Sequence, residues 1–355
     1  MNTSGAISGT PSRNGIFPAL IRVTDRDGRQ VERTLSITIG SPLQITTTSL
    51  PPGTLGQTYS ASVSASGGTA PYSFSAASGS LPGGVSLDAS GNLSGQPSVP
   101  GTFSLSIRAT DSSIPAQNTT ASFSVTVAAP TLPTLTLTGV TDTPSPGSQP
   151  NLGINLSGPA PVPLTGMSTL TFTPDAGSDD PGVVFSNGQR TANFTIAEAA
   201  TNALFNPDPL GLQTGTVAGT ITIVTRLFSN GVDVTPTPPP TRVLRIAPGP
   251  PVITSVSLVR SGQSLQIVVT GYAPTRQVTS AAVTFVPASG ANLQTAQFNI
   301  PVESHFVSWY GSAASVQFGS QFTLTLPFNG NASAVGSVQV SLTNPQGTSN
   351  SVTAN

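Results

Sequence analysis

The chain has 355 residues, of which only 7% are charged, and its formal net charge is −1. An average soluble protein has about 25% charged residues. All 12 basic residues are arginines in scattered positions, which argues against nucleic acid or an anionic membrane surface as a partner. Cysteine is absent, so disulfides and thiolate metal sites are excluded.

Residues 1–41 predict a single antiparallel hairpin. Apolar residues alternate with polar ones from Phe17 to Val23 and again from Val31 to Ile39, on either side of the turn at 25–28. This period of two places each apolar set on one face of the sheet. Because two strands are not a stable unit alone, we interpret this segment as the C-terminal half of an Ig-like module and expect the chain to start inside it.

Residues 42–129 predict a complete module that ends with the same hairpin. The segment 7–25 recurs as 93–111 at a constant offset of 86 residues, and ten of its 19 positions are identical. The return strand around Val125 lies 88 residues after its counterpart, so two residues are inserted in the turn, where insertions are tolerated. A fixed period of this size indicates tandem domains.

Residues 130–248 and 249–355 predict two further β-sandwich domains, because short alternating segments are separated there by Gly, Pro, Asn and Asp. The family of residues 130–248 stays open at this stage. Ile196–Leu204 is the best candidate for a helix, and the segment from His305 to Gly311 alternates as a strand does. The predicted fold class is therefore all-β, with tandem Ig-like sandwiches of which the first is incomplete.

A family resemblance rests on short motifs in a fixed order across residues 42–129. They include Leu50-Pro51-Pro52-Gly53, Gly67-Gly68, Pro71-Tyr72, Leu81-Pro82-Gly83-Gly84, Leu93-Ser94-Gly95 and Thr110-Asp111. With these motifs the module resembles the "putative Ig" (cadherin-like) repeats of bacterial surface proteins. Residues 251–256 and 340–349 are similar to the ends of Ig-like modules of the IPT/TIG type. The resemblances imply an exported surface stalk or adhesin, sometimes attached to a secreted enzyme.

The residues that enzymes need are not arranged here as a catalytic set. His305 is the single histidine, and no G-x-S-x-G motif presents a nucleophile beside it. Asp179 and Asp180 are adjacent within a turn-like AGSDDPG segment, whereas glycosidases need two carboxylates at a set separation. Phosphate-binding and dinucleotide-binding motifs are absent as well. We therefore predict that the protein is not an enzyme and has no catalytic residues.

Calcium is the one cofactor that the sequence leaves open. The resemblance implies it, since cadherin-like sandwiches often bind Ca²⁺ at joints between domains, and hard carboxylate oxygens are its ligands. Asp25, Asp27 and Asp111 are the candidate ligands, with Glu32 near the first two. The alternative is a hairpin turn in which Asp bonds the backbone and Gly supplies positive φ. The second copy of the motif retains only Asp111, which favours the turn; no other cofactor is expected.

Phe306, Trp309 and Tyr310 form the densest aromatic run and contain the only tryptophan. Exposed aromatic rings bind sugars and amphipathic partners, so Trp309 and Tyr310 are the candidate ligand platform. The alternative is that they pack between the sheets, where a lone tryptophan of a sandwich commonly lies. On a regular strand Trp309 would face away from the other two rings.

The predicted function is a non-enzymatic extracellular structural or adhesion array of a bacterium, either a surface stalk or an adhesin segment. We expect weak, multivalent contacts with surface glycans or other cell-surface proteins, with avidity supplying the strength. One alternative is an accessory carbohydrate-binding region of a secreted hydrolase, and another is a calcium-dependent cadherin-like adhesion module. No apolar run approaches the ~18 residues of a membrane span, so no membrane insertion is expected in this segment. A cell-surface or extracellular location implies a signal peptide upstream of this chain.

Overall fold

The structure is a computed structural model that describes residues 4–293 and 296–355. The chain divides into two compact units, Met1–Thr131 and Leu132–Asn355. Strands make up most of the regular structure in both units, and all but one of the strand pairs among the described residues, β4 with β11, are antiparallel. The predicted all-β class with tandem sandwiches is confirmed. No helix among the described residues is both long and apolar enough to cross a bilayer.

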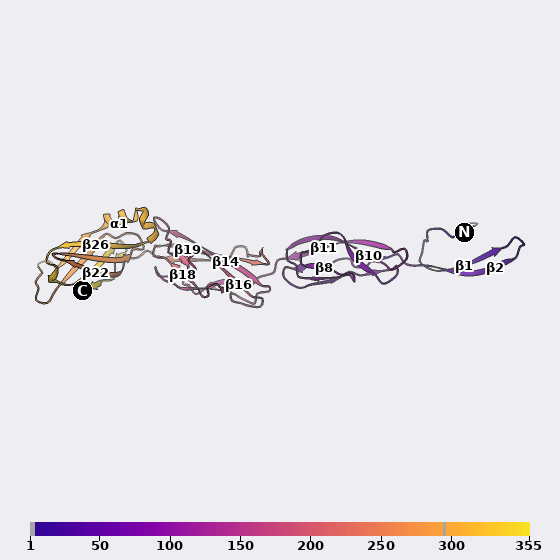
Figure 1. Ribbon diagram of the computed structural model, residues 1–355, viewed down its shortest axis with the longest axis horizontal. Helices are drawn as coiled ribbons and strands as arrows, with labels where there is room; N and C mark the ends of the chain where they lie inside the picture. Colours follow the sequence, from indigo (N-terminus) through magenta and orange to yellow (C-terminus); the bar gives the residue numbers. More distant parts are fainter. Residues whose placement is uncertain (1–3, 294–295) are drawn as a thin grey trace. The chain divides into compact units, whose positions relative to one another are not determined.

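The first unit begins with the predicted hairpin of β1 (Gly15–Thr24) and β2 (Gln30–Ile39), which pair antiparallel (Figure 1). Gly28 has φ +82°, the left-handed conformation that its place in the connecting turn requires. The two strands form a sheet of their own, with exposed apolar side chains at Ile16, Val23 and Val31, among others. Little buried apolar area is left to stabilise this hairpin.

We expect the hairpin to be the least protected sheet of the chain. In native-state hydrogen exchange, the amides of β1 and β2 should exchange many times faster than those around Leu105 and Ile107 in the complete module. The physical reason is that opening the hairpin exposes almost no additional apolar surface, so its local opening free energy is small. Mass spectrometry with peptide resolution measures this, and equal protection in the two segments would contradict the expectation.

The complete module has three hydrogen-bonded sheets in the same unit. The first sheet has the order β4 (Gly53–Thr54), β11 (Asn118–Ala128), β10 (Gly101–Thr110), β7 (Ser73–Gly79). The second contains β5 (Tyr59–Ser62), β9 (Asn92–Gly95) and β8 (Val85–Leu87), while β3 (Gln44–Ile45) pairs with β6 (Ala65–Ser66). Leu105 and Ile107 of β10 and Val125 of β11 are buried on the face that the period of two predicts.

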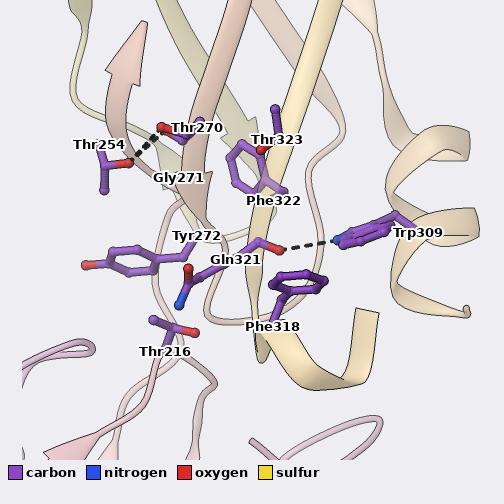
Figure 2. Close-up of a pocket in the computed structure, with 10 residues that line it drawn as sticks. All are labelled: Thr216, Thr254, Thr270, Gly271, Tyr272, Trp309, Phe318, Gln321, Phe322 and Thr323. Atoms are coloured by element: carbon purple, nitrogen blue, oxygen red, sulfur yellow. Dashed lines mark hydrogen bonds between the residues drawn. The ribbon is translucent and has the colours of Figure 1, made fainter. Parts of the chain in front are cut away.

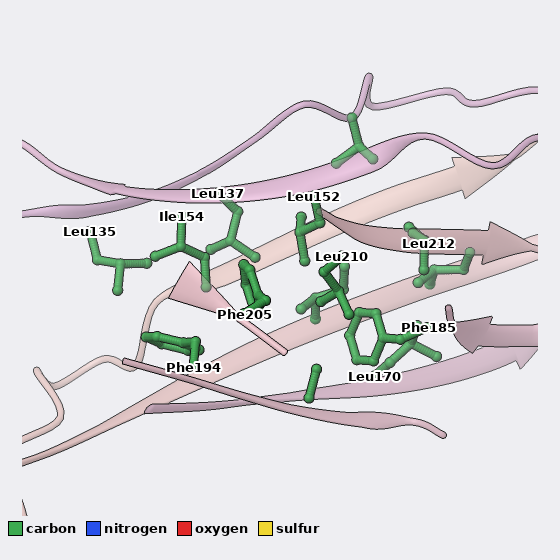
Figure 3. Packing of buried hydrophobic residues seen from close by; sticks show 14 of the residues in the cluster. Leu135, Leu137, Leu152, Ile154, Leu170, Phe185, Phe194, Phe205, Leu210 and Leu212 are labelled. Carbon is green, nitrogen blue, oxygen red and sulfur yellow. The ribbon is translucent and has the colours of Figure 1, made fainter. Parts of the chain in front are cut away.

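The second unit opens with a ten-stranded sandwich, in which β14 and β19 run side by side (Figure 1). One sheet is formed by β12 (Leu135–Thr138), β13 (Asn151–Leu156), β18 (Leu210–Thr214) and β15 (Val183–Phe185). The other is formed by β17 (Leu204–Phe205), β16 (Thr191–Ile196), β14 (Leu164–Pro174), β19 (Gly219–Ser229), β20 (Val232–Asp233) and β21 (Thr241–Ile246). Figure 3 shows the core between them, where Phe185 and Leu212 are fully buried.

Ile196–Leu204, the best helix candidate in the sequence, is not a helix. Ile196 ends β16 with its side chain buried in the core, and Leu204 begins β17. Between them the chain turns, and Ala199 has φ +62°, outside the right-handed helical region. Tertiary packing decides here, because Ile196 and Leu204 pair into the sheet at either end of the segment and override its weak local preference for a helix.

The last sandwich completes the second unit. One sheet is β22 (Val252–Ser261), β23 (Ser264–Tyr272) and β26 (Gln321–Asn329). The other is β25 (Gln297–Pro301), β24 (Ser280–Pro287), β27 (Val335–Asn344), β28 (Gly347–Thr348) and β29 (Val352–Ala354). Three short helical segments lie outside the sheets, namely α1 (Glu303–Tyr310) and the 3-10 turns η1 (Ala313–Phe318) and η2 (Ala332–Ala334).

The strand predicted from His305 onward is wrong, because this segment is α1. Phe306 and Tyr310 are four residues apart and therefore share one face of the helix. Phe306 is buried and packs edge-to-face on Phe322 of β26, with ring centroids 5.0 Å apart. Phe306 is part of the core of the last sandwich, and Trp309 and Tyr310 pack against that core. Alternation over so few residues does not exclude a helix.

Candidate functional site

A buried carboxylate organises the loop that leads into β15. The Asp180 side chain is 2% exposed and lies at the C-terminal end of the AGSDDPG segment. Its Oδ2 accepts hydrogen bonds from the backbone N–H groups of Thr216 at 2.7 Å and Val217 at 3.0 Å, and its Oδ1 accepts from Gly182 at 2.9 Å. Three amide donors therefore offset the desolvation of the charge.

Arg276 reaches the same loop from the last sandwich, where it lies in the connection between β23 and β24. Its Nε donates to the Gly319 carbonyl at 3.1 Å. Its two Nη atoms donate to the carbonyl oxygens of the Asp180 loop, at Ala176 (3.3 Å), Ser178 (2.5 Å) and Asp179 (3.1 Å). Burial lowers the pKa of Arg276, and the nearby Asp180 charge opposes that shift. The guanidinium stays charged because its ordinary pKa is so high.

Backbone groups connect the two sandwiches directly. Ser320 donates its N–H to the Thr216 hydroxyl oxygen at 3.1 Å and its hydroxyl to the Thr216 carbonyl at 2.8 Å. The Ala218 N–H donates to the Pro274 carbonyl at 2.9 Å. Gly319 has φ +63°, and a Cβ there would lie 2.5 Å from the Asp180 carboxylate, so glycine is required. We call this set of contacts the joint.

An aromatic pocket of about 710 Å³ lies beside the joint (Figure 2). The Trp309 indole is half-buried, donates from Nε1 to the Gln321 carbonyl at 3.3 Å, and lies against Phe318 with centroids 5.8 Å apart. Figure 2 shows Trp309 and Phe318 on one side of Gln321 and Tyr272 on the other. The complete lining is Thr216, Thr254, Thr270, Gly271, Tyr272, Trp309, Phe318, Gln321, Phe322 and Thr323.

The structure separates the two predicted platform residues. Trp309 lines the pocket, but Tyr310 does not; its hydroxyl donates to the Ser320 carbonyl at 2.5 Å, and burial raises its pKa. Tyr310 therefore supports the joint. The sequence analysis missed Phe318 and Tyr272. Each stands close to an element end where a glycine follows or precedes it, which is a weak signal without the tertiary structure. His305, set aside as a catalytic candidate, is exposed on α1.

Two of the three predicted calcium ligands, Asp25 and Asp111, accept hydrogen bonds from nearby backbone, and the third, Asp27, donates its backbone N–H to Asp25. Asp25 and Asp111 follow β1 and β10 at equivalent positions. The Asp25 Oδ1 accepts from the N–H groups of Asp27 at 2.9 Å and Arg29 at 2.8 Å, as in a side-chain-capped turn. Among the described residues, no three His, Cys, Asp or Glu side chains gather as a metal site. Calcium binding stays a prediction, which a thermal melt with and without EDTA tests; coincident curves would overturn it.

Asp111 holds the end of the complete module through a larger set of contacts. Its side chain is 6% exposed and accepts from the N–H groups of Thr69 (2.9 Å) and Gln117 (2.7 Å) and from the Ser113 hydroxyl (2.7 Å). The Ser113 hydrogen bond is the main cause that lowers the pKa of Asp111 from 3.8 to about 2, with the backbone donors adding to it against desolvation.

This shift predicts an acid-dependent loss of stability. Because the folded pKa of Asp111 lies below the unfolded one, its contribution is fully present above about pH 4 and is lost as the pH falls toward about 2. The melting temperature of the module should fall over this range, and the fall should be smaller in Asp111→Asn. Calorimetry at several pH values measures both. Identical pH profiles for the wild type and the variant would contradict the prediction.

The match to a family model concerns the complete module. Residues 41–128, about a quarter of the chain, match the model described as "Putative Ig domain". This segment is a domain of that family. The Ig-like resemblance of residues 42–129 is thus confirmed, whereas the IPT/TIG likeness of the last domain stays a prediction. No curated protein matches the chain.

Several solved structures are similar to this chain at low sequence identity. A protocadherin gammaB7 EC3-6 cis-dimer structure is 14% identical with a TM-score of 0.25, and the match covers 65% of this chain and 58% of that one. Protocadherin Gamma B2 domains 1-5 are 12% identical with a TM-score of 0.28, covering 97% and 77%. The human Desmocollin-1 ectodomain is 10% identical with a TM-score of 0.23, covering 95% and 84%. Similarity at this level transfers no partner or activity to the Ig-family domain or to its neighbours.

Proposed function

We propose that this protein is a non-enzymatic structural or adhesion segment of an extracellular, bacterial surface protein. Its Ig-family domain and neighbouring sandwiches are load-transmitting modules, and residues 132–355 act as one rigid segment of two sandwiches. The joint is the single observation that carries this proposal. Such a role needs a fixed geometry between domains rather than a reactive centre.

The contacts of the joint support rigidity for a physical reason. A flexible linker would leave the loops of both sandwiches hydrated and free to reorient. Here Arg276 donates to carbonyl groups of both sandwiches, and Thr216 accepts two hydrogen bonds from Ser320. Rotation of one sandwich against the other would break these bonds together and leave the partly buried Arg276 guanidinium without its acceptors in the Asp180 loop, which is costly for a desolvated charge.

A distance measurement between spin labels tests the proposal. The chain contains no cysteine, so Val243→Cys in β21 and Val286→Cys in β24, both exposed, can be labelled selectively in the full chain. Double electron–electron resonance should give one narrow distance distribution. In the background of Arg276→Ala the distribution should broaden, whereas Arg260→Ala, which removes hydrogen bonds within the last sandwich alone, should leave it narrow. A broad distance distribution in the labelled protein that retains Arg276 would overturn the rigid segment.

A carbohydrate-binding role is the second candidate, and the aromatic pocket favours it. This role is compatible with the first, because an adhesion segment needs a surface that recognises something. If many copies of the protein bind one surface together, their combined affinity would be useful even where the Kd of a single site is millimolar.

A further inference from the structure

We propose that the pocket beside Trp309 binds a neutral sugar unit of a glycan. This inference deepens the adhesion part of the proposed function by naming its site and ligand class. The pocket volume of about 710 Å³ falls within the range of roughly 300–1,000 Å³ that is usual for small-molecule sites. A sugar ring has an apolar face and a rim of hydroxyl groups, and the pocket offers partners for both.

The aromatic wall is fixed before any ligand arrives. Trp309 is held by its hydrogen bond to the Gln321 carbonyl, and Phe318 lies against it with an interplanar angle of 34°. Phe318 is 44% exposed, so part of its ring faces solvent at the rim of the pocket. Below them Phe322 is buried against Phe306. Rings that are already ordered lose little entropy when a sugar stacks on them, which favours binding.

The polar part of the lining is neutral throughout. It consists of hydroxyl and amide groups from threonines, Tyr272 and Gln321, with no Asp, Glu, Arg or Lys among the lining residues. Burial raises the pKa of Tyr272, so its phenol stays protonated at neutral pH. Thr254 and Thr270 bond to each other. Within the described chain, the side-chain polar atoms of Tyr272, Gln321 and Thr323 make no hydrogen bond and are free for a ligand. An anionic glycan would find no countercharge here.

The choice of sugar over a proline-rich peptide follows from hydrogen-bond chemistry. Aromatic pockets also bind polyproline segments, whose prolines offer carbonyl acceptors and no N–H donors. The free groups here include two hydroxyls and a carboxamide, each of which both donates and accepts. Sugar hydroxyls also donate and accept, so they can pair with both the donors and the acceptors of the lining. A proline-rich segment has no N–H donors and would leave the acceptors of the lining unpaired.

Isothermal titration of the full chain with neutral oligosaccharides tests the proposal. The probes are cellohexaose, maltohexaose, xylohexaose and mannohexaose at millimolar concentration, with a proline decapeptide as the competing class. At least one oligosaccharide should bind, and Phe318→Ala should weaken its binding by about tenfold, as expected for loss of one stacked ring. Tyr272→Phe keeps the ring and removes only the hydroxyl, and it should weaken binding several-fold. The matched control is Val307→Ala, an exposed position on α1 outside the pocket.

The outcomes separate the ligand from the fold and from the joint. Phe318 and Tyr272 are partly exposed, so both variants should keep the wild-type melting temperature within a few degrees. Failure of all four oligosaccharides, or binding that neither pocket variant weakens, would overturn the site. Binding of the decapeptide alone, reduced by the same variants, would replace the sugar with a peptide. Neither outcome would change the spin-label distances, so the titration tests the sugar site and the distance measurement tests the rigid segment independently.

Discussion

Asp180→Ala should lower the stability of the second unit by about 3–5 kcal/mol, the largest effect that we expect from a single substitution at the joint. Removal of the carboxylate leaves the N–H groups of Thr216, Val217 and Gly182 buried without their acceptor. The loop at 175–182 also loses the group that sets its shape, so Arg276 no longer meets an ordered row of carbonyls.

Denaturant unfolding of the full chain, followed by circular dichroism and calorimetry, measures this loss. Asp180→Asn is the matched control, because it preserves volume and one acceptor but places an NH₂ group against amide donors. The free energy of unfolding of Asp180→Asn should lie between that of the wild type and that of Asp180→Ala. The transition of the Ig-family domain at residues 41–128 should keep its midpoint in both variants. A loss below about 1 kcal/mol in Asp180→Ala would mean that solvent can replace the carboxylate.

Arg276→Ala should cost about 2–3 kcal/mol and should also loosen the joint. The substitution removes hydrogen bonds to four carbonyl oxygens, three in the Asp180 loop and one at Gly319. It also removes a positive charge that interacts with the buried Asp180. In calorimetry we expect the single transition of residues 132–355 to separate into two, since each sandwich has its own core.

Arg276→Lys separates the contribution of the forked guanidinium hydrogen bonds to stability from that of the positive charge. A lysine retains the charge but its ammonium cannot reach carbonyls on both sandwiches, so it should recover only a minor part of the stability. Arg260→Ala again serves as the control, because its hydrogen bonds stay within the last sandwich. Full recovery by lysine would show that charge alone holds the joint and that the fork is dispensable.

The strands were predictable because their signals are local. Alternation along Leu105 and Ile107, and turn residues such as Gly28, act over a few residues and survive without tertiary information. The recurrence of segment 7–25 at 93–111 indicated the length of one module. The helix candidate at 196–204 and the strand predicted at 305–311 both failed. Each segment is short, and burial in the tertiary structure decided between strand, turn and helix there.

The joint and most of the pocket could not be predicted. Asp180 and Arg276 are far apart in the sequence, and an Asp in a Gly-rich segment is as typical of a solvent-exposed turn as of a buried carboxylate. Trp309 was recognisable as a ligand candidate from its residue type alone. Tyr310, its neighbour, turned toward the joint because α1 places successive residues on different faces, and Phe318 and Tyr272 joined the pocket through folding.

Residual dipolar couplings on the full chain test the rigid segment most directly. In a weakly aligned sample, backbone N–H couplings from β14 and β19 report the orientation of the ten-stranded sandwich, and those from β23 and β27 report the orientation of the last sandwich. We expect one common alignment tensor to fit both sets with the geometry of the joint. Two tensors of different magnitude would mean that the sandwiches reorient independently, and the joint would then not be the element that makes residues 132–355 a rigid segment.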